Sequence, residues 1–276
     1  MEESLNKALH AKYNPEGSAL RRDQKELFRM LLVVNDICKK NGIKWWLSSG
    51  TLLGAARHKG YIPWDDDMDI VLLKEDYKKL EKILCEMESD EFVFHCTKTD
   101  VDYVNVFGKF RKRVGIVHAS SLRYRYYKWT GIGFDIFAIE KTNYFSALLG
   151  HLFYAQSQKL TQYISANWLR KPLIRAIEFI NFGIIFPVLR LIGKINPKEE
   201  YHYVLGTGWP KHTFFMKYTM PLTTTEFEGE QMPVPKDMDS YLRNVYGDWR
   251  TIPSEENIKN AIHCQEYRDE IYGKRE

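Results

Sequence analysis

Four aspartates crowd into five residues, directly before a short apolar run. The acids are Asp65, Asp66, Asp67 and Asp69, and an Ile-Val-Leu-Leu run occupies residues 70–73. Carboxylates this close repel one another, so a folded chain keeps them together only where something offsets the repulsion. The apolar run has the length and composition of a buried strand. The chain must therefore fold so that a core strand presents several carboxylates to a common partner.

Composition narrows the class of protein. A chain of 276 residues can bury one large core, and 44% hydrophobic with 28% charged residues is ordinary for a soluble globular protein. A net charge of +4 is too weak to indicate a nucleic-acid partner, and we expect none. The N-terminal residues are polar with no apolar signal core, so we expect a cytosolic protein. No CxxC pair occurs among the cysteines, which indicates a reducing compartment; they are Cys38, Cys85, Cys96 and Cys264.

Hydrophobic periodicity predicts a mixed α/β core. Residues 19–41 are expected to form an amphipathic helix that Gly42 ends in a left-handed cap. Strands are predicted at 43–47, 68–73, 92–96, 104–110, 114–118 and 134–139, with helices at 51–58 and 75–87. In the last third we expect a strand ending at Phe227, a turn at 228–229, and a helix over 236–246 ended by Gly247. Alternating strands and helices followed by clustered strands favour a mixed sheet over a regular parallel one.

Residues 144–194 are aromatic and apolar and are predicted to add a helical subdomain. Arg175, Glu178 and Arg190 interrupt this segment, and Pro187 is expected to break it. The uninterrupted apolar run is then shorter than the roughly 20 residues that a bilayer requires. We expect a buried helical subdomain, and the alternative is a helix lying in the membrane surface.

Three units follow from these elements. A mixed α/β core is expected over 1–140, and a helical, aromatic-rich segment over 141–220. Residues 221–276 are expected to pack back on the core.

The acids themselves suggest a metal site. Asp67 and Asp69 are two apart, so on a strand they project from one face. Paired carboxylates suit Mg²⁺ or Mn²⁺, which also takes substrate phosphates; for an isolated pair, an acidic surface turn is the alternative. Ser49 and Gly50 precede a helix whose first N–H groups can receive phosphate. Asp135 lies in a second apolar strand, where a buried acid is costly unless paired or ligated. A small-residue turn, a paired acid strand and a third acid form the layout of a nucleotidyltransferase palm, in which two metal ions clamp a phosphoryl displacement.

Three blocks of sequence resemble motifs of the LicD family, which includes fukutin and fukutin-related protein. They lie within 45–80, 131–140 and 226–253, and they read WLSSGTLLGAARHKGYIPWDDDMDIVL, GFDIFAIE and FEGEQMPVPKDMDSYLRNVYGDWRTIP. Ala138 stands where the family usually has Pro, and the resemblance is weak through 141–220. It implies that 1–140 is a nucleotidyltransferase-like catalytic core and that 141–220 faces the acceptor or a membrane. It also implies metal-dependent transfer of a phospho-alcohol from a CDP-activated donor. In bacterial members this is typically phosphocholine, from CDP-choline to sugars of teichoic acid or lipopolysaccharide.

Carried over by position, the resemblance assigns roles to individual residues. The turn that holds the donor phosphates is assigned to Ser49, Gly50 and Thr51. The metal pair is Asp67 and Asp69, and Asp135 either completes the metal site or acts as the base. The remaining candidates have weaker assignments: Asp65 and Asp66 as support for the ligands, Arg57 and Lys109 as diphosphate clamps or solvated cations, and His58 as a base or a surface residue.

A choline head group would be recognised by aromatic faces. Aromatic residues near the acids in sequence are candidates, although most are expected to be core; they are Trp45, Trp46, Trp64, Trp129, Tyr124, Tyr126 and Tyr127. Trp249 is expected to be structural. Rival functions are transfer of ribitol phosphate, glycerol phosphate or a nucleotide, and a non-enzymatic glycan- or membrane-binding scaffold. A lipid-linked acceptor would bring residues 170–194 to the inner face of the membrane.

Overall fold

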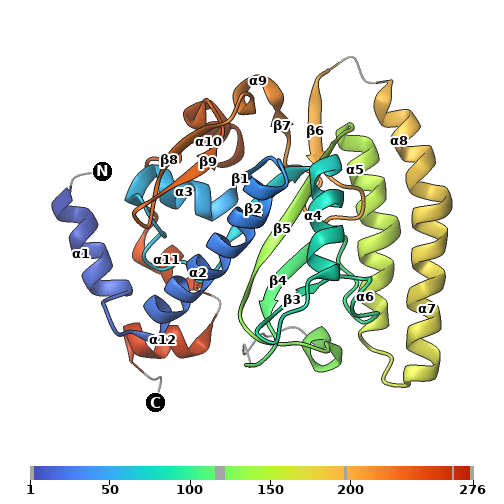
Figure 1. Cartoon of the computed structure of the whole chain (residues 1–276), viewed down its shortest axis with the longest axis horizontal. Helices are drawn as coiled ribbons and strands as arrows, with labels where there is room; N and C mark the ends of the chain where they lie inside the picture. The colour runs from blue at the N-terminus through green and yellow to red at the C-terminus, as the bar shows by residue number, and fades with distance from the viewer. Residues whose placement is uncertain (1–2, 116–121, 196–197, 263, 274–276) are drawn as a thin grey trace.

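A mixed sheet forms the core of the protein (Figure 1). The computed structural model describes residues 3–115, 122–195, 198–262 and 264–273. The described strands of this sheet are β1 (Trp45–Leu47), β2 (Asp69–Leu73), β3 (Phe92–His95), β4 (Gly108–Lys112), β5 (Gly133–Lys141), β6 (Glu200–Tyr203) and β7 (Phe214–Phe215). Their order is β1-β2-β5-β4-β3, with β6 pairing the last part of β5 and β7 pairing β6. Only β2 and β5 run parallel among these described pairs, which confirms the predicted mixed α/β class.

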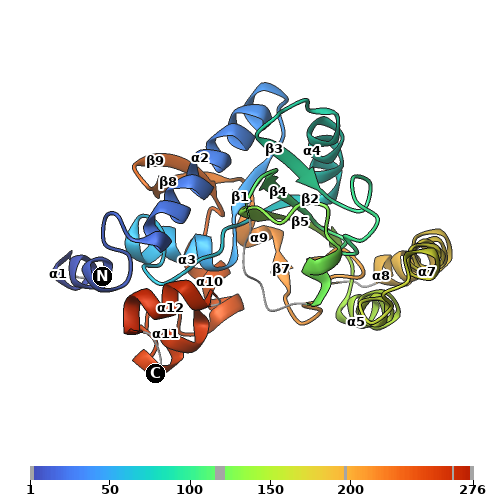
Figure 2. The ribbon, with the colours of Figure 1, turned by 90° about the horizontal axis from the view of Figure 1, so that it is seen from below.

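Two amphipathic helices cover one face of the sheet (Figure 2). α2 (Ala19–Lys40) contacts β5, and α4 (Lys74–Glu86) contacts β2, β3 and β5. The Ser18 side chain accepts a hydrogen bond from the Arg21 amide at the start of α2, and Gly42 has a φ of 61° just past its end. The helix predicted over 19–41 and its glycine cap are therefore confirmed.

Two predicted strands, at 104–110 and 114–118, differ from the structure. The strand expected over 104–110 begins only at Gly108. Val104 is buried outside the sheet, and Val106 packs on the separate apolar cluster around Tyr154 and Phe186. Apolar spacing predicted burial at these positions, but the two side chains are not part of a strand. Of the strand expected at 114–118, Val114 is exposed and irregular, and 116–118 lie outside the described residues.

The segment after β5 forms two long antiparallel helices, here called the helical hairpin (residues 144–195), at the edge of the molecule (Figure 1). The first helix consists of α5 (Tyr144–Gly150), the π-helical turn η2 (His151–Gln156) and α6 (Ser157–Thr161). The second consists of α7 (Asn167–Ile180), the π-helical turn η3 (Asn181–Ile185) and α8 (Phe186–Lys194).

The hairpin differs from the sequence prediction in three ways. Pro187 does not break the second helix, because the π-helical turn just before it accommodates the ring and the missing N–H. Much of the outer surface is exposed, so the subdomain is not fully buried. The chain also re-enters the sheet at β6 and β7, so the helical part of the predicted 141–220 unit ends near residue 194.

The C-terminal block packs back on the first part of the core. β8 (Thr223–Phe227) and β9 (Glu230–Val234) form a hairpin whose turn residues, Glu228 and Gly229, have φ values of 53° and 86°. β9 was not predicted, and it contains Pro233, a residue that is uncommon within strands. The remaining helices are α1 (Glu3–Tyr13), α3 (Ser49–His58), α9 (Met216–Thr219), α10 (Met238–Tyr246), α11 (Glu255–Ala261) and α12 (Gln265–Tyr272), with a 3₁₀ turn at Leu122–Tyr126. All four cysteines are free thiols.

Candidate functional site

A cavity of about 280 Å³, here called the acid pocket, lies where β2 and β5 begin. It is lined by Ser49, Gly50, Thr51, Asp65, Asp67, Asp69, Asp135, Phe137, Tyr203, Trp209, His212 and Tyr246. The predicted phosphate turn and the three predicted acids therefore meet in one place, although Asp135 is far from the others in sequence. A more open groove of about 540 Å³, bordered by α1 and the Arg21–Glu228 ion pair, contains none of the predicted phosphate or metal residues.

Strand register brings the acids together. Asp69 on β2 is the pairing partner of Asp135 on β5, and Asp135 is in turn opposite Lys109 on β4. Neighbouring strands lie about 4.8 Å apart, so the three side chains form a row across the sheet. The row ends in an ion pair, with 2.9 Å between Lys109 Nζ and Asp135 Oδ1. Lys109 thus orients an acid of the pocket, a different contact from the predicted diphosphate clamp.

The start of α3 forms the opposite wall. The Ser48 hydroxyl is 3.2 Å from the Tyr241 hydroxyl and makes no capping bond to the helix. The first N–H groups of α3 are therefore not capped by Ser48 and can receive an anion. Ser49 has a φ of 49°, a left-handed conformation that non-glycine residues rarely adopt and that clusters at functional sites. The Thr51 hydroxyl accepts a hydrogen bond of 2.8 Å from the Asp69 amide, which ties the helix to the acid strand.

The four acids of residues 65–69 do not all point the same way. Asp67 precedes β2 instead of lying within it, yet it lines the same pocket as Asp69. The strand alternation used to predict their common face was therefore wrong, while the common site is observed. Asp65 also lines the pocket, and a Cβ on Gly50 would come within 2.5 Å of its Oδ2. Asp66 instead accepts a 3.1 Å hydrogen bond from the Cys264 amide.

The electrostatics of the pocket suit a divalent cation. Burial, and then the nearby carboxylates of Asp135, Asp67 and Asp65, raise the pKa of Asp69 well above its usual range. Burial opposes the charge of Lys109, but the neighbouring groups, Asp135 first and then Tyr124 and Asp67, together outweigh burial and raise the pKa of the lysine. Ligand oxygens of Asp65, Asp66 and Asp67 also lie within 4.8 Å of one another. Crowded hard oxygen donors beside the uncapped N–H groups of α3 fit Mg²⁺ or Mn²⁺.

Aromatic side chains form the third wall, which the sequence did not reveal. Ring centroids of Phe137, Tyr203 and Trp209 lie 5.1–6.2 Å apart, and His212 is 6.0 Å from Tyr203. Phe137 is two residues after Asp135, so strand alternation alone could have placed it on the same face. The segment at 203–212 has no comparable periodicity. Its rings reach the pocket only because β6 returns to the sheet.

Other predicted candidates lie elsewhere. The Arg57 guanidinium donates hydrogen bonds to the carbonyl oxygens of Trp249 and Thr251, and Arg57 does not line the pocket. His58 is buried and bonds Asn6, so it is neither a surface residue nor in the pocket. Trp249 is largely buried and donates to Asp239, which confirms a structural role. None of the seven aromatic candidates lines the acid pocket: Trp45, Trp46 and Trp64 are core, and Tyr124, Tyr126, Tyr127 and Trp129 lie around the 3₁₀ turn.

Comparison with known proteins identifies the family of this fold and pocket. The family described as LicD/FKTN/FKRP, nucleotidyltransferase domain, matches residues 42–187, more than half of the chain. The chain belongs to this family. It is therefore a transferase of the LicD family, as the three sequence blocks predicted.

Individual relatives differ in how much of the chain they match. The lipopolysaccharide cholinephosphotransferase LicD of Haemophilus influenzae is 27% identical over 264 residues, which cover 90% of this chain and 97% of that protein. Human ribitol 5-phosphate transferase FKRP is 48% identical over 42 residues, 15% of this chain and 8% of that protein. Human ribitol-5-phosphate transferase FKTN is 38% identical over 63 residues, 23% of this chain and 13% of that protein.

Proposed function

We propose that the acid pocket transfers phosphocholine from CDP-choline to a hydroxyl of a cell-surface glycan, in a lipopolysaccharide or teichoic-acid precursor. One observation carries the proposal: carboxylates and an open helix start face a wall of aromatic rings in a single cavity. The first two features suit a diphosphate with a divalent cation, and the third suits a cationic head group. Similarity along 97% of the lipopolysaccharide cholinephosphotransferase supports the choice of choline.

The reaction needs an in-line displacement at the phosphorus that carries choline. The acceptor oxygen forms a new bond to that phosphorus, the bond to the bridging oxygen breaks, CMP leaves, and the acceptor hydroxyl loses its proton. When bound by Asp67, Asp69 and Asp135, Mg²⁺ or Mn²⁺ would supply positive charge for the phosphate oxygens. The N–H groups at the start of α3 would hold a phosphate oxygen. Asp135, held by Lys109, is the pocket carboxylate that would accept the hydroxyl proton if it is not a ligand.

The aromatic wall would hold the trimethylammonium group. Phe137 and Tyr203 are buried, whereas Trp209 is 46% exposed and forms the rim of the pocket. A cation over such a ring gains about 0.5–2 kcal/mol, depending on how far the contact is desolvated. Trp209 is therefore the residue best placed to select choline over an uncharged alcohol.

Trp209 also borders a second cavity of about 220 Å³, which we assign to the acceptor glycan. This acceptor cavity lies between residues 104–107, the first helix of the hairpin and the loop at 206–209. Its polar lining residues include Asn105, Lys159 and Thr207. An aromatic ring beside amide, hydroxyl and amino groups is suited to a sugar, which offers both apolar C–H faces and hydroxyls. An acceptor bound there would reach the acid pocket past Trp209.

The decisive experiment is mass spectrometry of purified protein incubated with CDP-choline, Mg²⁺ and candidate oligosaccharides. The proposal expects a phosphocholine mass shift on the glycan together with release of CMP. Release of pyrophosphate would instead show nucleotide transfer. A protein without metal-dependent binding of CDP-choline in calorimetry would be a scaffold, and either result overturns the proposal.

The names of the human relatives make ribitol phosphate the rival transferred group. A parallel assay with CDP-ribitol and CDP-glycerol tests it. We expect Trp209→Leu to lower kcat/KM for CDP-choline about tenfold, because it removes the cation contact. Preference of the wild-type protein for CDP-ribitol would refute the choline assignment while leaving the transferase chemistry intact. As a separate check of the acceptor cavity, Asn105→Ala should raise the KM of the glycan without weakening CDP-choline binding.

A further inference from the structure

The outward face of the helical hairpin is apolar to a degree found nowhere else in the described chain. Most of the exposed large apolar side chains of the described residues lie between 144 and 195. The most exposed are Leu160, Tyr163, Trp168, Phe179, Leu191 and Ile195, each at least 63% accessible. Soluble monomers rarely expose a contiguous apolar surface of this extent, and a larger one marks a contact with a membrane or another protein.

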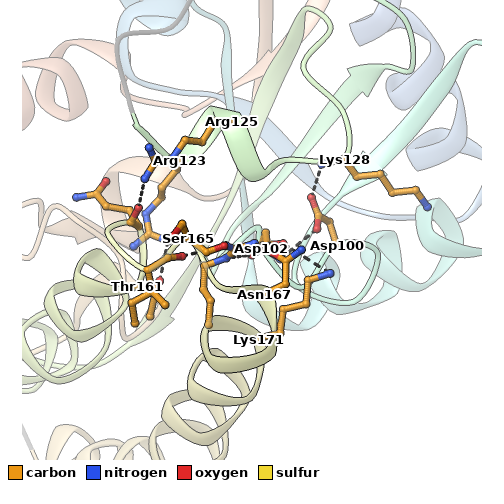
Figure 3. A network of polar contacts seen from close by, with 12 residues as sticks. Asp100, Asp102, Arg123, Arg125, Lys128, Thr161, Ser165, Asn167 and Lys171 are labelled. Carbon is orange, nitrogen blue, oxygen red and sulfur yellow. Dashed lines mark hydrogen bonds and ion pairs between the residues drawn. The ribbon is translucent and has the colours of Figure 1, made fainter.

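The inward face of the hairpin is fastened to the core by buried charges. Arg170 Nε donates to Asp102 Oδ1 at 2.8 Å, and its Nη1 donates to the carbonyl oxygens of Ile164 and Ser165. Figure 3 shows how this network continues from Asp102 to Lys171 and, beside it, from Asp100 to the Lys128 amide. Further along the same helix, Arg190 pairs with the buried Glu140 at 2.8 Å.

These ion pairs decide between a helix that crosses a membrane and one that lies on it. α7, η3 and α8 form one helix, Asn167–Lys194, of 28 residues, long and apolar enough to span a bilayer. Spanning would pull Arg170 and Arg190 away from Asp102 and Glu140 and place them in hydrocarbon, which is strongly unfavourable. The hairpin can instead remain on the core and bury only its outer face. The geometry therefore favours a surface-bound helix.

The charges of the hairpin indicate which surface it meets. Residues 144–195 are all described, and their exposed charged side chains are cations: Lys159, Lys171, Arg175 and Lys194. The single acid in this range, Glu178, is buried and pairs with Arg175. Basic residues around an apolar face suit anionic lipid head groups. A second copy of the same face would bring like charges together.

Aromatic residues at the bend strengthen this assignment. Tyr163 and Trp168 flank the connection between the two helices and are 66% and 79% exposed. Both side chains combine an apolar ring with a polar atom, and both are enriched at the level of lipid head groups. Lys159 and Lys171 lie close by in sequence, so the bend presents rings and cations together.

We propose that the helical hairpin docks the protein flat on an anionic bilayer surface, with its outer apolar face in the head-group and upper acyl region. Trp168, Phe179 and Leu191 enter the interface, and Lys159 and Lys194 contact lipid phosphates. This surface is separate from the acid pocket, so the proposal does not depend on the transferase chemistry. Because the first helix of the hairpin also lines the acceptor cavity, a docked protein would hold that cavity next to the lipid surface.

Sedimentation with vesicles tests the docking directly. Wild-type protein should bind vesicles of phosphatidylcholine with 30% phosphatidylglycerol more tightly than vesicles of phosphatidylcholine alone. Phe179→Glu and Leu191→Glu should each weaken binding about tenfold, because each removes a large apolar side chain from the interface. Leu5→Glu, at an exposed apolar position of α1, is the matched control and should bind like wild type. Lys159→Gln and Lys194→Gln should each reduce the preference for anionic vesicles about fivefold.

Three results would overturn the proposal. One is equal vesicle binding by Phe179→Glu, Leu5→Glu and wild-type protein, with all three equally folded by circular dichroism. Another is a dimer in light scattering that Phe179→Glu dissociates, since the face would then be covered by a second copy. The third is membrane-bound protein that resists extraction by alkaline carbonate, because a surface-bound hairpin should be released and a spanning one retained.

Discussion

The acid pocket and the helical hairpin expose opposite kinds of chemistry: the pocket gathers several carboxylates, and the hairpin presents a largely apolar surface. In the pocket, Asp65, Asp67, Asp69 and Asp135 gather in one cavity, and Lys109 pairs with one of them, Asp135. In the hairpin the inward charges are matched by partners, as in Arg170 with Asp102 and Arg190 with Glu140. The exposed surface of the hairpin is instead largely apolar.

This difference separates residues that contribute to activity from residues that contribute to stability. Crowded like charges cost stability and are retained where a ligand offsets the repulsion. Matched buried pairs fix one element against another, and removal of one member leaves an uncompensated charge. Substitutions in the pocket should therefore affect activity more than stability. Substitutions on the inward side of the hairpin should do the reverse.

The largest expected effect is on activity, from Asp69→Asn. Removal of one carboxylate from the pocket should lower kcat/KM on the order of a hundred- to a thousandfold, the loss typical of a group that stabilises charge in a transition state. The melting temperature should not fall, because burial and neighbouring acids already disfavour the charged form of Asp69. Steady-state kinetics and calorimetric melting measure the two quantities.

Asp66→Asn is the matched control within the same acid run. Asp66 does not line the pocket, and its Oδ2 accepts the Cys264 amide, although one of its oxygens lies within 4.8 Å of oxygens of Asp65 and Asp67. The substitution should therefore cost about 1 kcal/mol of stability and less activity than Asp69→Asn. If Asp66→Asn and Asp69→Asn lose equal activity, the division of the run by direction is wrong.

The next effect is on stability, from Arg170→Met. Asp102 would keep a buried carboxylate without its main partner, which should cost about 3–5 kcal/mol of unfolding free energy in urea titrations. Adding Asp102→Asn should restore part of the loss, since the stranded charge is removed. A single variant as stable as wild type would show that this ion pair does not anchor the hairpin.

A smaller effect concerns the pH dependence of stability, which His58 at the last position of α3 should influence. Burial, followed by the charges of His10 and Arg57, lowers the pKa of His58 to about 3, so the folded protein holds a neutral imidazole whose Nδ1 lies 2.6 Å from Asn6 Oδ1. The unfolded chain takes up a proton near its ordinary pKa of 6.5. Stability from this group is therefore complete above pH 6.5 and falls as the pH drops toward 3.

His58→Gln should remove that dependence. Between pH 7 and pH 5 the wild-type protein should lose about 2 kcal/mol more unfolding free energy than the variant. Urea titrations at the two pH values measure the difference, because the other titrating groups are common to both proteins. Parallel losses in the two proteins would mean that His58 is protonated in the fold.

The acids of the site could be predicted from sequence because they depend on local and repeated patterns. Asp69 begins a strand with clear apolar spacing, Asp67 lies two residues before it, and Asp135 lies inside another strand. The structure added their register, Asp69 opposite Asp135, and placed Asp67 before the strand instead of on its face. The mixed sheet was predictable for the same reason, since most of its strands are short apolar runs bounded by turns.

The aromatic wall could not be predicted because its residues reach the pocket only in the tertiary structure, where the chain returns to the sheet. Tyr203, Trp209 and His212 follow a helical hairpin of some fifty residues and reach the pocket only through pairing of β6 with β5. Proximity in sequence instead favoured Trp45 and Trp46, which fill the core. Arg57 likewise lies outside the pocket: its guanidinium donates to backbone carbonyls of the C-terminal block, almost two hundred residues away.

The smallest effect comes from Gly50→Ala, which tests whether the close approach of α3 to Asp65 contributes to binding. Alanine is compatible with helix α3 and should stabilise it slightly, but its Cβ would lie 2.5 Å from Asp65 Oδ2 and must displace that carboxylate. We expect about tenfold weaker metal-dependent binding of CDP-choline, equivalent to about 1.4 kcal/mol, with no loss of melting temperature.

Gly208→Ala is the control, because a Cβ there meets no atom within 4 Å although the loop borders the acceptor cavity. Calorimetric titration of both variants decides the matter. If Gly50→Ala binds the nucleotide as Gly208→Ala does, the approach of α3 to Asp65 contributes nothing to binding, and the acids alone carry the pocket.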